Sequence, residues 1–79
     1  MSPGLKHIWS DNVPQNDFIY IIETYEQNAH LYPWLIVKFS ASPGSHYGAL
    51  VGHGEESTLE KAKQAALRKR QEIMAGDSA

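Results

Sequence analysis

The sequence predicts a small α+β domain in which a three-stranded antiparallel sheet packs on one C-terminal α-helix, in the order βββα. Three observations lead to this prediction. The chain has 79 residues, which suits a single small domain over residues 1–79 with a modest core. Segments rich in β-branched and aromatic residues all precede residue 57. A helix-start signal followed by helical apolar spacing comes only after that point.

The strands are predicted from composition and from turn signals. Residues 1–17 are rich in Pro, Gly, Asn and Asp, so we expect an extended N-terminal arm there. Residues 18–25 (FIYIIETY) and 31–40 (LYPWLIVKFS) predict the first two strands, and Pro33 is tolerated near a strand start. Residues 41–45 predict a turn and residues 46–52 (HYGALVG) the third strand. Short connections favour an antiparallel meander.

The helix is predicted from a capping box. Ser57 and Glu60 have the S-x-x-E spacing of a reciprocal N-cap, which predicts a helix from there to Met74. At 100° per residue, the apolar residues of this segment form one stripe, made of Leu59, Ala62, Ala66 and Ile73 with Leu67 and Met74 at its edge. Residues 75–79 predict a frayed C-terminal tail.

One helix can cover only one of the two apolar layers that strand alternation creates. We expect the layer containing Lys38 to face water, so the helix would cover the opposite layer, which contains Ile19, Ile21, Leu35, Val37, Phe39 and Leu50. The uncovered layer would then bind a partner. Its predicted partner-binding residues are Tyr20, Ile22, Trp34, Ile36 and Tyr47, flanked by acidic Glu26, Glu55 and Glu56. Coverage by the N-terminal arm and a two-fold homodimer are open alternatives.

Charge and composition narrow the function classes. The net charge is −2 and there is no cysteine, so disulfides and thiolate metal sites are excluded and a cytoplasmic location is expected. No apolar run reaches the roughly 20 residues that span a bilayer, and we expect no membrane association. Residues 1–56 carry −4 from two cations and six acids, whereas residues 57–75 carry +3 from five cations and two acids. The basic helix offers candidate phosphate contacts at Lys61, Lys63, Lys69 and Arg70.

Candidate catalytic residues are few. The histidines, at positions 7, 30, 46 and 53, lack helical ligand spacing, so no metal site is predicted. Ser57 is explained as a cap, and Glu55 and Glu56 sit in an expected exposed turn that gives no burial to raise a carboxyl pKa. Gly52-His53-Gly54 resembles the start of a phosphate loop, but glycines of a strand-to-helix turn explain it more simply. We therefore expect no enzyme activity and no cofactor.

Two families share parts of this pattern. Gly52-x-Gly54, then Ser57, then residues 62–67 (AKQAAL) resemble the C-terminal half of double-stranded-RNA-binding domains, which implies a three-stranded sheet leading into a helix that binds RNA. Thr58 and Leu59 stand where that family has its paired lysines, so the implied RNA contacts reduce to Lys61 and Lys63. The same outline resembles the sheet domain of HicB-type antitoxins, which implies a protein partner. In size, acidity and lack of cysteine, the chain is similar to small phage-encoded inhibitors such as anti-CRISPR proteins.

These observations favour a non-enzymatic protein-binding module or inhibitor. It would cover the surface of a larger protein, such as a nucleic-acid-binding complex, through the aromatic sheet layer and the acidic turns. The alternative is a small nucleic-acid-binding domain that uses the basic helix.

Overall fold

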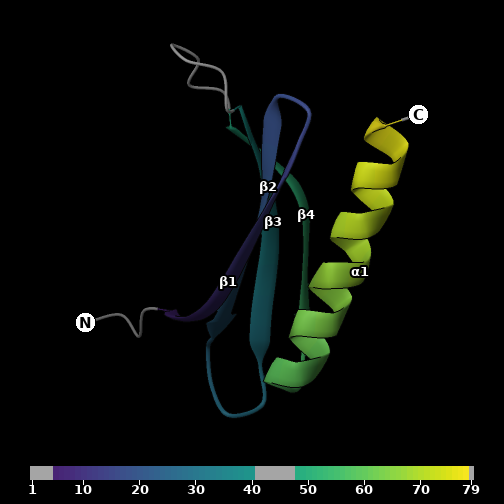
Figure 1. The fold of residues 1–79 in the computed structure, drawn as a ribbon. Coiled ribbons are helices and arrows are strands. Elements are labelled where there is room, and N and C mark those ends of the chain that lie inside the picture. The colour runs from purple at the N-terminus through teal and green to yellow at the C-terminus, as the bar shows by residue number, and fades with distance from the viewer. Residues whose placement is uncertain (1–4, 41–47, 79) are drawn as a thin grey trace.

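The computed structural model describes residues 5–40 and 48–78, which form strands followed by one helix (Figure 1). The strands are β1 (Lys6–Gln15), β2 (Phe18–Glu26), β3 (Tyr32–Ser40) and β4 (Gly48–Glu56), and the helix is α1 (Leu59–Asp77). The predicted α+β class, antiparallel sheet and C-terminal helix are confirmed. The prediction of three strands is wrong, because the sheet has four in the order β1-β2-β3-β4. Tyr47 and the turn predicted at residues 41–45 lie outside the described residues.

The additional strand, β1, takes most of the place of the predicted N-terminal arm. It pairs antiparallel with β2, ending with Gln15 opposite Phe18. Asn16 and Asp17 form the turn between them, and Asn16 has a φ of 57°. Two-residue hairpin turns need this left-handed conformation, which asparagine tolerates well. The breakers around residue 16 therefore make a hairpin, and Pro14 is tolerated because β1 is an edge strand.

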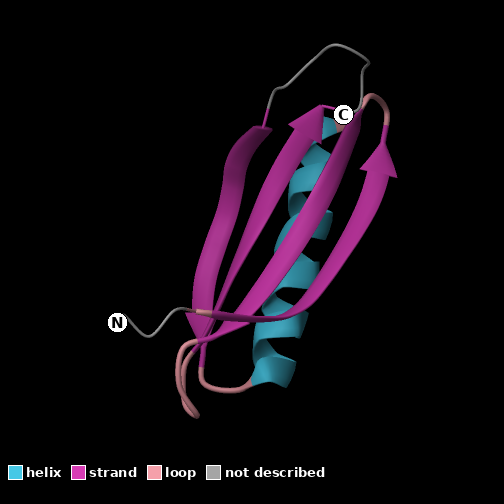
Figure 2. Ribbon diagram, turned by 90° about the vertical axis from the view of Figure 1, so that its left-hand side faces the viewer, coloured by secondary structure: helices cyan, strands magenta, loops and turns pink. Residues whose placement is uncertain are grey.

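The helix covers one side of the sheet. It packs on β2, β3 and β4, and Figure 2 shows it on the far side of the sheet when the sheet is viewed from its other side. Among the described elements, none packs on that other side. The Cα extents of 37 × 28 × 14 Å are those of a thin slab of two layers. We call the side under α1 the covered face and the opposite side the open face.

The layer that meets the helix is the reverse of the predicted one. Tyr20, Ile22, Trp34 and Ile36 lie on the covered face and are at most 7% exposed. The last three of them form the core with Ala62 and Ala66 of α1. The predicted helix-facing layer instead lies on the open face, opposite in strand alternation.

Side-chain size explains this choice of face. Gly52 and Gly54 of β4 lie directly opposite Ile36 and Trp34 in the sheet register. Because neither glycine has a side chain, the Trp34 indole can lie over Gly54, where an added Cβ would be 2.6 Å from the ring. Large side chains on β2 and β3 thus fit between small residues of β4 and small alanines of α1. The aromatic layer also removes the largest apolar area from water when it is the one covered.

Charge supports the same choice. Glu23 belongs to the layer that the sequence interpretation placed under the helix. Covering that layer would take its carboxylate out of water, which costs several kcal/mol unless it is fully paired. On the open face, Glu23 stays partly exposed and pairs with His7 at the edge of the sheet. Lys38, which was predicted to face water, lies on the covered side but reaches out to Asp77 at the end of α1.

Both ends of α1 differ from the prediction. The N-cap is Thr58 rather than Ser57, since Thr58 is extended and its side-chain oxygen accepts a hydrogen bond of 3.2 Å from the Lys61 N–H. The helix also continues past Met74 to Asp77, so the frayed tail predicted for residues 75–79 is wrong as far as residue 77. Residue 79 lies outside the described chain. Because β4 extends to Glu56, residues 53–56 belong to the strand and not to the predicted turn before the helix.

We expect Gly54→Ala to destabilise the fold, because its methyl group would meet the buried and rigid indole of Trp34. Overpacking of this kind costs about 1 to 3 kcal/mol, measurable by urea denaturation. The matched control is Gly76→Ala, whose added Cβ meets nothing within 4 Å. In a helix that change should be neutral or stabilising by up to about 1 kcal/mol. Equal stability of both variants would contradict the packing argument.

Candidate functional site

The open face is an exposed and partly apolar surface formed by the strands. Sheet partners share a face, and the central row across the sheet runs from Asn12 through Ile21 and Val37 to Leu50. The adjacent row holds Pro14, Ile19 and Phe39, and on the other side of the central row Leu35 lies beside Glu23. Leu50 is 59% exposed and Phe39 is 40% exposed. The open face is therefore apolar at its centre and accessible at the β4 side.

Polar groups on the open face gather at one end. His7 Nε2 pairs with the carboxylate of Glu23, and the His7 ring meets the Tyr25 ring edge-on at 5.3 Å. At the β4 edge of the same end lie His53 and Glu55, both exposed. The described open face thus combines an apolar centre with two carboxylates, Glu23 and Glu55, toward one end, which we call the acidic rim. Its histidines are the only described basic side chains on it.

The predicted partner-binding residues are divided by this arrangement. The four apolar side chains Tyr20, Ile22, Trp34 and Ile36 are buried beneath α1, so in this fold they have no surface to offer a partner. Glu26 accepts a hydrogen bond of 3.4 Å from the Tyr32 hydroxyl on the covered side. Glu55 and Glu56 end β4, and only Glu55 lies on the open face. Acidic and exposed apolar residues do lie on one face of the sheet, but this face is the layer that was predicted to lie under the helix.

The predicted phosphate contacts are also divided. Arg70 points into the covered side and is 6% exposed, so it is not available to a phosphate group in this fold. Its guanidinium donates to the Asp11 carboxylate at 2.6 Å and to the backbone carbonyl of Asp11 at 3.0 Å. Lys63 Nζ lies 5.2 Å from the centroid of the Trp9 ring, which is a cation–π contact. Lys61 and Lys69 are exposed.

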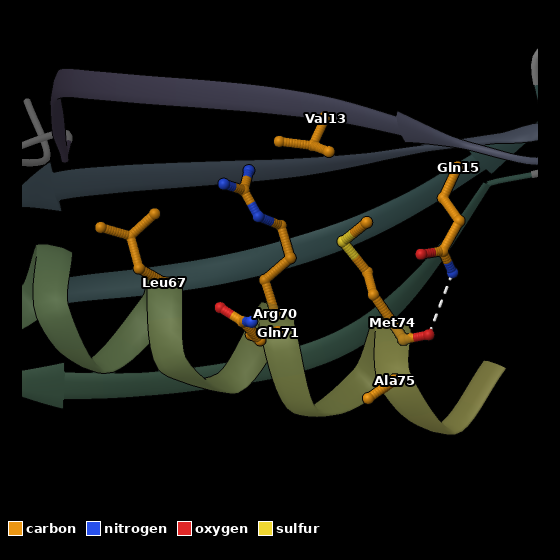
Figure 3. Close-up of a pocket in the computed structure, with 7 residues that line it drawn as sticks. All are labelled: Val13, Gln15, Leu67, Arg70, Gln71, Met74 and Ala75. Atoms are coloured by element: carbon orange, nitrogen blue, oxygen red, sulfur yellow. Dashed lines mark hydrogen bonds between the residues drawn. The ribbon is translucent and has the colours of Figure 1, made fainter. Parts of the chain in front are cut away.

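A groove of about 410 Å³ lies between β1 and α1 (Figure 3). Figure 3 shows Leu67, Arg70 and Met74 pointing from the helix toward the strands, with Val13 facing them from β1. Gln15 closes one end by donating a 3.0 Å hydrogen bond to the Met74 carbonyl. The groove exists because α1 packs on β2, β3 and β4 more than on β1. The Arg70 guanidinium is already bound to Asp11 and is not available to a ligand. The groove is therefore a gap between β1 and α1 that polar contacts bridge.

A second group of polar contacts fixes the C-terminal end of α1 to the sheet. The Asp77 carboxylate accepts from the Tyr20 hydroxyl at 2.5 Å and pairs with Lys38 Nζ at 3.0 Å. The hydrogen bond from Tyr20, followed by the one from Lys38, lowers the pKa of Asp77 below its usual 3.8. Burial first, and then the bond to Asp77, raise the pKa of Tyr20, while the Asp77 bond raises that of Lys38. An acid in the last turn opposes the helix dipole, so this pairing explains its presence there.

Comparison of the chain with protein-family models, curated proteins and solved structures finds no match. The resemblances to double-stranded-RNA-binding domains, HicB-type antitoxins and phage inhibitors therefore stay predictions. Over the described residues, no helix is long and apolar enough to cross a membrane. Within residues 5–40 and 48–78, no group of three or more His, Asp or Glu side chains is arranged to hold a metal ion.

The covered face could have been assigned from the sequence by pairing large residues with small ones. The residues of the open face would then follow from strand alternation. Gly52 and Gly54 are two residues apart in a strand and therefore lie on the same face. Because they leave space there, the adjacent strand needs large side chains on that face. Ala62, Ala66 and Arg70 follow at four-residue spacing on one line of α1, which indicates a narrow, close-packed helix face. Trp34 and Ile36 supply the bulk that both sets lack.

We expect Asp77→Asn to lower the stability of the fold at pH 7, because it removes the carboxylate that Tyr20 and Lys38 share. A carboxyl group whose pKa is lower in the folded state stabilises the fold above its unfolded pKa and loses that effect as pH falls. The difference in unfolding midpoint between wild type and variant should therefore shrink below about pH 4. Urea denaturation between pH 3 and pH 7 measures it.

The exposed Glu72 on the same helix provides the control for this experiment. Glu72→Gln should change stability little, because among the described side chains Glu72 has no ion-pair partner. A constant difference between wild type and Asp77→Asn across the acid range would show that Asp77 contributes by some means other than its charge.

Proposed function

We propose that this chain is a non-enzymatic protein-binding module that binds its partner through the open face. The observation that carries the proposal is the exposure of apolar side chains on an uncovered sheet, with Leu50 59% and Phe39 40% exposed. These two side chains continue into Ile19, Ile21 and Val37 across the sheet. Apolar patches larger than a few hundred Å² are uncommon on monomeric proteins and usually mark an interaction site.

The size of the open face supports this proposal. Strands spaced about 4.8 Å apart and roughly nine residues long give four strands a projected area on the order of 500 Å². The accessible area is larger, because side chains stand up from the sheet. A standard protein interface buries about 800 Å² on each partner, so the open face is large enough to be most of one.

Charge indicates the chemistry of the partner. Glu23 and Glu55 lie at the rim of the open face, while Lys61, Lys63, Arg68 and Lys69 all lie on α1, in the other layer. The fitting partner is a protein surface with an apolar centre flanked by Lys or Arg. Complementary charges of this kind guide association and orientation.

An inhibitory role follows from the same chemistry. Protein surfaces that bind nucleic acid are rich in Lys and Arg, and a module with an acidic rim competes with phosphate for them. Coverage of such a surface on a larger protein is therefore the form of inhibition we propose. The similarity in size and acidity to phage-encoded inhibitors, anti-CRISPR proteins among them, supports this part of the proposal.

The alternative function is nucleic-acid binding through α1. It is favoured by one observation, which is that Lys61, Arg68 and Lys69 are exposed on the layer opposite the acidic rim. The loss of Arg70 to the Asp11 ion pair weakens it. Phosphate binding requires an affinity that falls steeply with salt, whereas binding at the open face, which rests mainly on apolar contact, should fall much less.

We expect Leu50→Ser to abolish capture of the partner while the protein stays folded, because Leu50 is the most exposed apolar side chain of the open face. The matched control is Leu67→Ser, since Leu67 lies on α1 and is itself 40% exposed. Tagged wild type and both variants would be incubated with lysate of the source cells, with and without nuclease treatment. Affinity for the captured protein, measured after its purification, should fall at least about tenfold for Leu50→Ser only.

Two results would contradict the open-face proposal. One is equal capture by Leu50→Ser and Leu67→Ser. The other is recovery of nucleic acid alone, lost at moderate salt and sensitive to Lys69→Gln, which would favour the alternative function.

A further inference from the structure

The sheet has two free edges, and they differ in their protection against pairing with another strand. β1 carries Pro14, which lacks the N–H that strand pairing uses, and a register irregularity between His7 and Trp9. β4 has no proline. Its irregularity lies opposite the Ile36/Val37 step, so the stretch from Gly52 to Glu56 is regular. Among the described strands, none pairs with the outer side of this five-residue segment, so its outward-pointing backbone groups make no strand pair.

We propose that a second copy of this chain pairs with β4 in antiparallel orientation, about a two-fold axis at Gly54. The two sheets would join into one continuous sheet of eight strands, with both helices on the same side. This inference goes beyond the proposed function, because it uses an edge of the sheet and leaves the open face uncovered. An isologous contact of this kind closes with two copies, and so removes the β4 edge from both.

Charge selects the register. With the axis at Gly54, His53 of one copy lies opposite Glu55 of the other on the open side, and the pair occurs twice. An axis at Glu55 would set two like-charged glutamates against each other. An axis at His53 would set two imidazoles against each other and leave neither Glu55 carboxylate opposite a histidine. Directly opposed like charges destabilise a strand pair, whereas opposite partners stabilise it. In the described chain neither His53 nor Glu55 has an ion-pair partner.

The helix side of the same edge is also complementary. Glu56 of the second copy would lie opposite Gly52, and Lys69 extends over Gly52, with its Cγ 3.4 Å from the position of an added Cβ. Arg68 and Lys69 border a cleft of about 330 Å³ between β4 and α1. The glycine leaves room there for the incoming carboxylate, and the lysine supplies its counter-charge.

A buried donor at this edge supports the inference independently. Trp34 Nε1 has no hydrogen-bond partner among the described residues although it is buried. It lies over Gly54, at 2.9 Å from where a Cβ would be, and the Trp34 side chain borders the cleft beside β4. Buried donors are rarely left unpaired. Pairing at β4 would bring new backbone carbonyls and the Glu56 carboxylate of the second copy to this edge.

The first test is the mass of the full chain in solution, measured by sedimentation over a concentration series with charge variants. Wild type should reach twice the monomer mass. His53→Glu should weaken the dimer about tenfold, because each Glu55 then meets a like charge. The double variant His53→Glu with Glu55→Lys restores opposite partners and should restore the wild-type dimer constant to within a factor of about three.

The second test is site-specific crosslinking, which is clean because the chain has no cysteine. A mixture of His53→Cys and Glu55→Cys proteins should form a disulfide heterodimer faster than either variant alone. Ser10→Cys mixed with Asn12→Cys is the matched control, since these exposed residues have the same spacing on the open side of the other edge strand. That mixture should show no preferred heterodimer.

The outcomes separate the possibilities. A monomer at all concentrations, or crosslinking no faster at β4 than at β1, would overturn the proposal. A dimer that Leu50→Ser dissociates and His53→Glu does not would place the contact on the open face and would also overturn it. Because His53→Glu leaves Leu50 unchanged, loss of the dimer with partner capture retained would keep the two proposals distinct.

Discussion

The constraint on which the rest of this structure depends is that one helix of 19 residues must serve a sheet with two apolar faces. A helix is about 10 Å wide with its side chains, and this one packs on only one side of the sheet. Whichever layer it covers becomes the core, and the other stays in water. The buried positions, the placement of charge and the accessible apolar surface all follow from which layer the helix covers.

That choice depends on residues without side chains more than on the apolar ones. Trp34 and Ile36 can extend across β4 only because positions 54 and 52 are glycine. Ala62 and Ala66 bring the helix down onto the same side chains. Polar contacts then fix the helix along its length, with Arg70 tied to Asp11 near β1 and Asp77 tied to Tyr20 and Lys38 at its C-terminal end. These ion pairs neutralise Arg70, Lys38, Asp11 and Asp77, which would otherwise add to the surface charge of the two layers.

The fold class could be predicted from the sequence, but the layer of the sheet that the helix covers could not be predicted from strand alternation and charge alone. Strands at residues 18–26 and 32–40 and the C-terminal helix follow from propensity and periodicity, which are local properties. β1 was missed because Asn16 and Asp17 read as breakers of an arm, whereas a two-residue hairpin turn has the same composition. The prediction of the covered face is wrong because it assigns Lys38 to water by its charge. Lys38 lies on the covered side, with its ammonium group 4.3 Å from the centroid of the Phe18 ring and 3.0 Å from the Asp77 carboxylate. The prediction of Arg70 as an exposed phosphate contact is also wrong, because no local sequence pattern indicates that Asp11, 59 residues earlier, lies beside it.

Strand alternation has a last consequence in β2 and β3. Ile21 and Ile22 are chemically identical neighbours, yet one lies on the open face and the other is fully buried. A substitution at the second disturbs the core, whereas a substitution at the first changes only what the surface presents. Tolerance to mutation should therefore alternate residue by residue along these strands. Such a chain can acquire a new surface specificity at every other position while its folding information stays intact at the positions between.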